Sequence, residues 1–181
     1  MPDLLAHYLA SYLVARALIG SRRALLVAFV GLLPDVDAVF MVHRWVTHSI
    51  PIVLIASVPL LVLTLAYRRR YVGVVVVAVL IYMLHIVMDV FTGLTPILWP
   101  LAPAIGVVLE VNGVSNGESV VITPRVDVAV EPADFTRRDY IEGPIVAETG
   151  LMLAVVVAVA SAVEYIARRL RHAQPMGVRL W

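Results

Sequence analysis

The 181-residue chain contains no cysteine and no lysine. Without cysteine it can form no disulfide, thiolate nucleophile or Cys-ligated zinc site. Any bound metal must therefore take its ligands from histidine, carboxylate, backbone or water. All fourteen basic residues are arginine, and thirteen acidic residues leave a formal net charge of +1. A charge this small indicates neither a nucleic acid nor an acidic partner.

Long apolar runs dominate the chain. Hydrophobic residues make up 61% of it and the mean hydropathy is +0.94, whereas a soluble domain is about half apolar. Two short segments, 4–19 and 24–33, would reach only ~24 Å and ~15 Å as helices, less than the ~30 Å core of a bilayer. We predict a single membrane domain over residues 1–181, an all-α integral membrane helical bundle of about four to five hydrophobic helices. Three longer runs approach the ~20 residues that a spanning helix needs: 51–67, 71–88 and 144–165.

Clusters of arginine predict how the chain crosses the membrane. If it crosses at each hydrophobic segment, all three clusters fall on one face, which the positive-inside rule makes cytoplasmic. The N-terminus and the connections 34–49 and 91–143 then lie on the opposite face. We predict a multi-pass protein of the cell membrane with a cytoplasmic C-terminus. Asp3 and the lack of a basic start indicate that the first segment is not a cleaved signal peptide. The clusters are Arg22 and Arg23, then Arg68, Arg69 and Arg70, then Arg168, Arg169 and Arg171.

The connection 91–143 contains β-strand signals. It holds three β-branched runs, and the Asn-Gly pairs at 112–113 and 116–117 are typical of hairpin turns. We predict a small β-hairpin or three-stranded flap, within an extramembrane insertion over residues 104–143, that acts as a lid or rim for a neighbouring site. The runs cover residues 107–111, 119–123 and 126–130.

Most of the histidines gather at one end of the predicted helices. His172 lies in the basic tail and needs no special role. The other four fall on the face opposite the arginine clusters, together with three aspartates. Ionisable residues at membrane depth are costly, so they are a functional hypothesis by default. The residues brought to this end are His7, Asp35, Asp37, His43, His48, His85 and Asp89.

The spacing of these residues suits metal binding. His85 and Asp89 are four residues apart, so both project from one helix face and can share an ion. Pro34 ends a helix before two carboxylates, of which one can reach the site while the other orients a ligand. Asp3 lies four residues before His7 and is predicted to hold its tautomer. Each of these residues also has an interpretation without a metal. His7 could be an interfacial polar residue, Asp35 and Asp37 a helix-end turn, and His85 with Asp89 a hydrogen-bonded pair.

Taken in order, the motifs resemble those of the YdjM-like membrane-bound metal-dependent hydrolases. The resemblance covers residues 3–101 and includes Leu-Leu-Pro-Asp-Val-Asp at 32–37, Thr-His-Ser at 47–49 and Thr-Gly-Leu-Thr-Pro-Ile-Leu-Trp-Pro at 92–100. The resemblance also includes the His-Arg pair at 43–44, but Trp45 stands here in place of the small residue that usually follows it. The resemblance implies a membrane hydrolase that uses a metal. It also implies a ligand set of His7, Asp35, Asp37, His48, His85 and Asp89, with His43 beside it.

We predict metal-assisted hydrolysis of a phosphoester or ester in a lipid-like substrate that enters from the membrane lipid. A bound divalent ion lowers the pKa of its water toward ~7, and we expect zinc, with manganese and iron as alternatives. The implied ligands exceed the three to four of a single zinc, so one or two ions fit. The candidate catalytic residues are Asp35 or Asp37 as general base, Arg44 to neutralise an oxyanion, and His43.

Other functions are compatible with the same residues. A metal transporter or sensor would use the same ligands, although transport favours a site near mid-membrane that opens to both faces. A metal-free lipid phosphatase also places a His four residues before an Asp, but its Pro-Ser-Gly-His motif is absent here. A zinc intramembrane protease would need a His-Glu-x-x-His motif, which is absent as well. A structural protein whose outer loops bind a partner is the remaining alternative.

Overall fold

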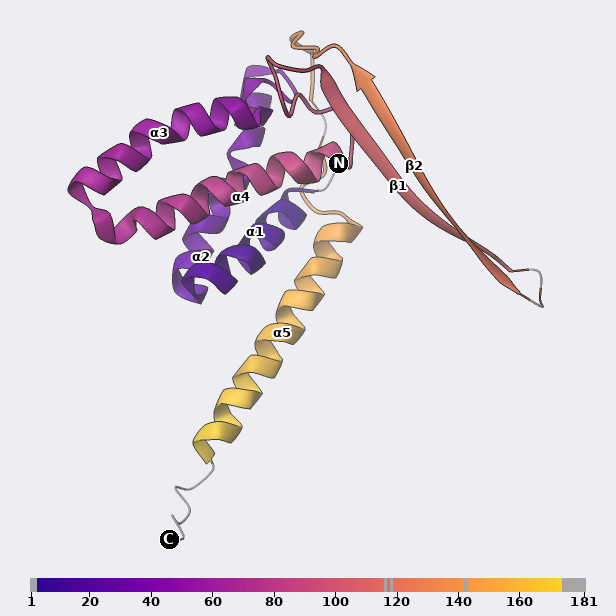
Figure 1. Ribbon diagram of the computed structural model, residues 1–181. Coiled ribbons are helices and arrows are strands. Elements are labelled where there is room, and N and C mark those ends of the chain that lie inside the picture. Colours follow the sequence, from indigo (N-terminus) through magenta and orange to yellow (C-terminus); the bar gives the residue numbers. More distant parts are fainter. Residues whose placement is uncertain (1–2, 116, 118, 142, 174–181) are drawn as a thin grey trace.

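The computed structural model describes residues 3–115, 117, 119–141 and 143–173. The described part is mostly helical, with one two-stranded antiparallel sheet, which confirms the predicted helical architecture with a small β element (Figure 1). α3 and α4 form a helical hairpin, α1 and α2 lie beside α4, and α5 runs away from the others. The elements are α1 (Leu4–Ile19), α2 (Ser21–Val27), the 3₁₀ helices η1 (Ala28–Leu32), η2 (Pro34–Phe40) and η3 (Val46–His48), α3 (Ile50–Tyr67), η4 (Arg69–Tyr71), α4 (Val72–Val90), β1 (Ala104–Ser115), β2 (Val120–Glu131) and α5 (Glu148–Ala173).

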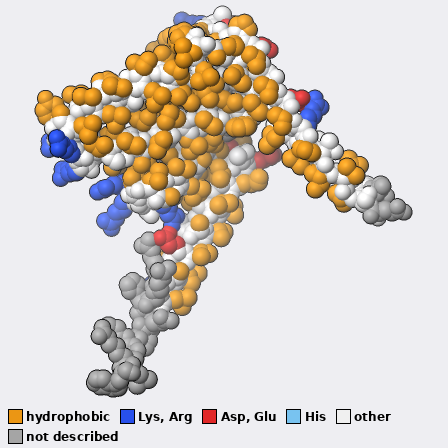
Figure 2. All heavy atoms as spheres, viewed as in Figure 1, with side chains coloured by type: hydrophobic (Ala, Val, Ile, Leu, Met, Phe, Trp, Pro, Cys, Tyr) orange, Lys and Arg blue, Asp and Glu red, His pale blue; other side chains and the backbone are white. Residues whose placement is uncertain are grey.

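Three helices of the described chain are long and apolar enough to cross a membrane. They cover Ile50–Tyr67, Arg69–Val90 and Glu148–Ala167, with mean hydropathies of 2.4, 2.5 and 2.1. Hydrophobic side chains cover most of the visible face of the helices (Figure 2). Helices that are apolar all round and yet exposed are typical of membrane spans. These three helices correspond to the three long runs of the sequence, while α1 is a shorter apolar helix of 16 residues.

A broken helical segment follows α1. Gly20 ends α1 with a φ of 79°, a conformation that glycine adopts readily, and the chain reverses there into α2. α2 continues into η1 and η2, so helical structure extends to Phe40. At ~1.5 Å per α-helical and ~2.0 Å per 3₁₀ residue, this stretch is on the order of 30 Å long. It is therefore much longer than the helix predicted at 24–33. Pro34 begins η2, so it does not end the helical structure as predicted.

Small side chains let the first helices approach α4 closely. Ala15 of α1, Ala24 of α2 and Ile81 of α4 are buried in one cluster. Gly31 of η1 lies against Ser11 and Ile81, and a Cβ at position 31 would collide with the Ser11 side chain. Small residues are typical of helix contacts in membranes, because they allow backbones to approach. This packing holds the backbone of η1 directly beside α4.

β1 and β2 form a long hairpin that projects away from the helices (Figure 1). Its base lies near the C-terminal end of α4, where Ile105 bridges to Thr95. Most of the hairpin therefore does not cover the helix ends as a lid, but Ala104 and Glu131 at its base line a pocket together with Arg44, as the alternative of a rim predicts. The segment after β2 instead returns to the helix ends, where the Arg138 N–H donates to the Met41 carbonyl (2.8 Å).

The hairpin turns later in the chain than the first predicted turn, the Asn-Gly pair at 112–113. The Asn-Gly pair at 112–113 is wrong as a turn prediction, because both residues are paired with β2 inside the ladder. Gly117 has a φ of 89°, which places it in the turn, and Asn116 lies outside the described residues. The runs predicted at 119–123 and 126–130 form one strand, so the described part holds two strands and not three.

α5 is attached to α1 at two polar points. Near the start of α5, the Gly150 N–H donates to the buried Asp3 carboxylate (2.9 Å). Further along, Arg16 forms an ion pair with Glu164 and donates to Ser161 (3.1 Å). The rest of the α5 surface is mostly exposed, in keeping with the way the helix diverges from the bundle (Figure 1).

Candidate metal centre

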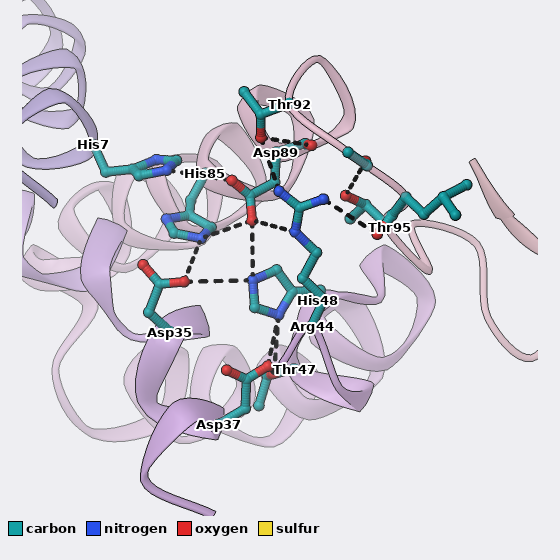
Figure 3. Close-up of polar contacts among 12 residues, drawn as sticks. His7, Asp35, Asp37, Arg44, Thr47, His48, His85, Asp89, Thr92 and Thr95 are labelled. Carbon is teal, nitrogen blue, oxygen red and sulfur yellow. Dashed lines mark hydrogen bonds and ion pairs between the residues drawn. The ribbon is translucent and has the colours of Figure 1, made fainter. Parts of the chain in front are cut away.

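The predicted site residues meet at one end of the bundle, where four helical elements converge (Figure 3). α1 begins there, η2 and η3 lie there, and α4 ends there. The arginines at 22–23 and 68–70 lie at the opposite ends of these helices, around the α1–α2 and α3–α4 turns. Polar side chains are rare elsewhere in the buried interior, so their concentration here calls for a chemical explanation. The residues brought together are His7, Asp35, Asp37, Arg44, His48, His85 and Asp89.

Four possible ligand atoms face one common point. Asp35 Oδ1 lies 3.7 Å from His48 Nε2 and 3.4 Å from His85 Nε2. Asp89 Oδ2 lies 3.4 Å from His48 Nε2 and 3.8 Å from His85 Nε2. All four atoms fall within 4.8 Å of one another. His48, His85 and Asp89 are fully buried, whereas Asp35 exposes 20% of its side chain.

These separations suit a shared ion better than direct hydrogen bonds. Ligands ~2.0–2.1 Å from a tetrahedral ion lie ~3.3 Å apart, while N–H···O bonds mostly measure about 2.7–3.2 Å. His48 Nε2, His85 Nε2 and Asp89 Oδ2 are buried and lack a hydrogen-bond partner among the described residues. Such buried atoms need an ion or a water to satisfy them. Two imidazoles and two carboxylates fit zinc, and they also suit iron or manganese.

The far nitrogen of each imidazole is held by an acceptor. His85 Nδ1 lies 2.7 Å from the Gly31 carbonyl oxygen, so Nδ1–H donates and Nε2 keeps its lone pair. His48 Nδ1 lies 3.0 Å from Asp37 Oδ2, which favours the same tautomer. Acceptors of this kind orient metal-binding histidines and raise their basicity. Nε2 of both rings therefore faces the same point, and each can offer a lone pair there when the imidazole is neutral.

Asp37 lies behind His48 and outside the group of four ligand atoms. Its Oδ2 also accepts from the Trp45 N–H (2.7 Å) and from the Thr47 hydroxyl (3.0 Å), and the residue is only 1% exposed. η2 is a 3₁₀ helix with three residues per turn, so residues two apart point in different directions. Asp35 consequently faces the ligand group, while Asp37 faces the outer nitrogen of His48.

His7 stacks on His85 beside the ligand group. The two ring centroids are 3.9 Å apart with an interplanar angle of 27°, and His7 Nε2 lies 3.4 Å from Asp89 Oδ1. The prediction that Asp3 holds His7 is wrong, because the Asp3 carboxylate accepts from the N–H groups of Ala6 and of α5. Burial opposes ionisation of Asp3, but these backbone donors hold its pKa below the usual range. Asp3 is therefore a helix cap that also ties α5 to α1.

Arg44 connects the ligand group to the loop after α4. Its Nε lies 3.2 Å from Asp89 Oδ2, and its other nitrogens donate to Thr92 Oγ1 (2.8 Å) and the Leu94 carbonyl (3.2 Å). Arg44 is 6% exposed and has a φ of 56°, an unfavourable conformation that surrounding contacts must maintain. A Cβ on Gly93 would lie 2.6 Å from Arg44 Nη1, so glycine leaves room for the guanidinium.

His43 lies outside the ligand group, on the wall of a partly polar pocket of about 310 Å³ that also contains charged side chains. Arg44 lines the same pocket, opposite the segment after β2 that carries Phe135 and Arg138. Burial and the neighbouring Arg44 lower the pKa of His43, so its imidazole is neutral near pH 7. Arg44 thus touches this pocket on one side and Asp89 on the other.

A second pocket, of about 440 Å³, opens between α3 and α4. Its walls are almost entirely apolar and include Leu33, Ile52 and Leu60. Thr47 also lines it, and Thr47 Oγ1 lies 3.2 Å from His48 Nδ1. Two pockets of different polarity are therefore each lined by a residue that contacts the ligand group.

Protons and cations compete at this group. Burial opposes ionisation of Asp35, but His48 and His85 hold its pKa well below the usual range. Burial alone would lower the pKa of His48, yet the three neighbouring aspartates raise it to about 10. A metal ligand must be a neutral imidazole, so a cation that binds His48 must displace a proton.

Several residues take part in the site although no role in it was predicted for them from the sequence. Thr47 and Thr92 hold Asp37 and Arg44, and Gly31 supplies a backbone carbonyl. A carbonyl has no sequence signature, and single threonines are common at helix ends. The one usable signal is a glycine inside an apolar run, which indicates close approach of another segment.

Comparison with known families adds an independent observation. The family model described as YdjM inner membrane protein matches residues 1–169. The chain belongs to this family. The match includes the β-hairpin and most of α5, whereas the motifs that carry the resemblance end near residue 101. No curated protein and no solved structure matches the chain. Family membership and the three apolar helices together establish a membrane protein.

Proposed function

We propose that this YdjM family protein is a membrane-embedded hydrolase that uses a divalent ion, preferably zinc, to cleave a phosphoester or ester in a lipid-like substrate. The observation that carries the proposal is the convergence of four ligand atoms within 4.8 Å. Three of these atoms are buried without hydrogen-bond partners among the described residues. The acceptors on the far side of both imidazoles support the same assignment.

The exposure of the ligands suggests how their roles divide. A bound zinc ion would polarise the scissile group and lower the pKa of a water toward ~7. Catalytic zinc sites usually keep three protein ligands and one open position. We assign His48, His85 and Asp89, which are buried, as the permanent ligands. Asp35, with 20% of its side chain exposed, then lies where water arrives and can accept the proton of that water.

Two further residues are assigned to the substrate side. Arg44 carries a fixed positive charge between the polar pocket and Asp89, so it can stabilise negative charge that develops on a phosphoryl or carbonyl oxygen. His43 lies on the pocket wall with a lowered pKa. A neutral imidazole there can donate a hydrogen bond to the substrate without repelling Arg44.

The two pockets support a substrate with a polar and an apolar part. The pocket beside Arg44 has charged as well as apolar walls, whereas the pocket beside Thr47 opens between two candidate membrane spans and is almost entirely apolar. A lipid headgroup and an acyl chain would match these environments. A substrate of this kind would reach the site from the bilayer and need no water-filled channel.

We further propose that the arginine-rich turns face the cytoplasm and that the metal centre faces the other side. The clusters at 22–23 and 68–70 lie at the helix ends remote from the site, as the positive-inside rule requires for this orientation. A site at one helix end also favours chemistry over transport, because a transport site is expected near mid-membrane.

Metal content and lipid hydrolysis together test the function. Protein in nanodiscs should retain at least one zinc, manganese or iron ion by plasma mass spectrometry, and His85→Ala should lose it. His43→Ala is the matched control, since this histidine is outside the ligand group, and it should keep the metal. Metal-loaded protein should then release headgroup or acyl product from phospholipid or lipid-phosphate substrates.

The possible failures separate the alternatives. Protein that binds no metal after loading would contradict the metal centre itself. Metal-loaded protein that hydrolyses none of these lipids, but carries zinc across a proteoliposome membrane, would instead indicate transport.

A further inference from the structure

The β-hairpin has one apolar and one polar face. Residues directly opposite each other in an antiparallel ladder share a face, and neighbours along a strand alternate. The pairing of Leu109 with Val126 therefore puts the odd-numbered side chains of β1 on the same face as the even-numbered ones of β2. That face holds no ionisable residue. It consists of Ile105, Val107, Leu109, Val111, Gly113 and Ser115 of β1 and Val120, Ile122, Pro124, Val126, Val128 and Val130 of β2.

The opposite face carries all the charges of the hairpin. Glu110 lies opposite Arg125 in the ladder, and Arg125 Nε forms an ion pair with Asp127 Oδ2 (2.7 Å). Glu131 lies on the same face at the base. Val108, Val114, Val121 and two alanines also lie on this face, so it is mixed, with its charged side chains between residues 110 and 131. The hairpin is therefore an amphipathic ribbon.

The apolar face has no partner among the described residues along most of its length. Leu109, Ile122 and Val126 are 62%, 67% and 58% exposed. Twelve residues at ~3.3 Å each make a strip about 40 Å long. A two-stranded hairpin is marginally stable at best in water, and it usually needs to pack its hydrophobic face on something else. An apolar strip of this size is larger than isolated exposed residues and indicates a contact surface.

We propose that this apolar face lies on the surface of the bilayer, at the boundary between headgroups and acyl chains. The hairpin starts only fourteen residues after α4 ends at Val90, and Ile105 is fixed to Thr95 beside that end. Its base is thus held where the span meets the interface. From there it runs outward, across the general direction of the helices (Figure 1). Hydrophobic side chains continue from the bundle along the hairpin (Figure 2).

The charge pattern favours lipid over a soluble partner. An amphipathic element at an interface buries its apolar side by ~5–10 Å and keeps its charged side in water. The hairpin shows this division, with its ion pair on the charged side and no charged group on the other. The placement of the hairpin on the bilayer depends on membrane insertion of the helices but not on the metal centre. The hairpin proposal and the metal-centre proposal can therefore fail independently.

The lack of cysteine allows a direct test with single labels. Leu109→Cys and Val126→Cys place a nitroxide on the apolar face, and Glu110→Cys and Arg125→Cys are the adjacent controls on the polar face. Each full-length variant is reconstituted in nanodiscs, and circular dichroism and thermal unfolding verify that it keeps its fold. The accessibility of each label is then measured to oxygen, which concentrates in lipid, and to a water-soluble nickel chelate.

Labels at 109 and 126 should be several-fold more accessible to oxygen than to nickel, and labels at 110 and 125 should show the reverse. Equal nickel accessibility on both faces would overturn the proposal by placing the hairpin in water. Low accessibility to both reagents at 109 and 126, with spin–spin broadening between chains, would also overturn it. That result would show that a second copy covers the face.

Discussion

The carboxylate of Asp37 lies 3.0 Å from Nδ1 of His48, on the side of the imidazole opposite the ligand group. Its Oδ2 is held in turn by the Trp45 N–H and the Thr47 hydroxyl. This chain of contacts sets the orientation and tautomer of His48, so Asp37 is a positioning residue in the proposed centre. It can therefore be altered without removing a ligand.

Asp37→Asn should weaken zinc binding by ~10–100-fold without abolishing it, the usual effect of losing an outer carboxylate. The amide is similar in size but cannot raise the basicity of His48 as a carboxylate does. Competition titration against a chromogenic chelator measures the affinity. Asp139→Asn is the control, because Asp139 is exposed and its loss should change nothing. An affinity for the Asp37 variant equal to wild type would refute the assigned role.

Metal binding should depend on pH because of His48. The neighbouring aspartates raise the pKa of His48 to about 10 against burial, so the folded metal-free protein holds this proton at pH 8, while an unfolded histidine with a pKa near ~6.5 does not. Zinc binding at pH 8 should therefore release about one proton per ion from this residue. Calorimetry in buffers of different ionisation enthalpy counts the protons, and a value near zero would contradict the expectation.

The same shift has a consequence for stability. A raised folded-state pKa stabilises the protein fully below ~6.5, and this contribution is lost as the pH rises toward 10. The unfolding temperature of metal-free protein should therefore fall between pH 7 and pH 10. The unfolding temperature of zinc-loaded protein should fall less over this pH range, because its His48 is bound to the metal and has no proton to release. Parallel thermal scans of the two forms measure the difference, and identical slopes would be the contrary result.

The location of the site could be predicted from local signals in the sequence. His85 and Asp89 share a helix face wherever α4 packs, since four residues make about one turn. The alternation of hydrophobic segments and arginine clusters placed the distant polar residues at one end. Both inferences use periodicity and topology, and neither needs the tertiary contacts.

The finer arrangement depends on tertiary structure and could not be predicted. The sequence predicted that one of Asp35 and Asp37 reaches the site while the other orients a ligand, but which residue does which depends on the 3₁₀ geometry of η2. The His85 tautomer depends on a carbonyl of η1. The hairpin register is set by a twelve-residue ladder, which overrides the local turn preference at 112–113. The length of the second helical segment was missed because Pro34 interrupts its pattern, although proline is well tolerated at a helix start.

Gly31 offers a test of the packing that supports the site. Gly31→Ala should destabilise the protein by about 1–3 kcal/mol, because the new Cβ would collide with Ser11 and overpack the α1–η1–α4 contact. Thermal unfolding in nanodiscs measures the change. Gly73→Ala makes the same substitution in α4 where a Cβ has no neighbour within 4 Å. It should be neutral or stabilising by up to about 1 kcal/mol. Equal destabilisation by both variants would show that Gly31 has no special packing role.

Arg44 separates metal binding from catalysis. Arg44→Gln removes the positive charge beside Asp89, so the proposed centre becomes more negative and should keep its zinc. Hydrolysis of an anionic lipid substrate should nevertheless fall by ~10²–10³-fold, because no charge remains to stabilise the developing oxyanion. Arg44→Lys should recover only part of the rate, since an ammonium cannot contact Asp89, Thr92 and Leu94 together. Metal analysis tests the expected retention of zinc, and initial rates on the same preparations test the expected loss of hydrolysis. Loss of zinc in Arg44→Gln would assign the residue to metal retention instead.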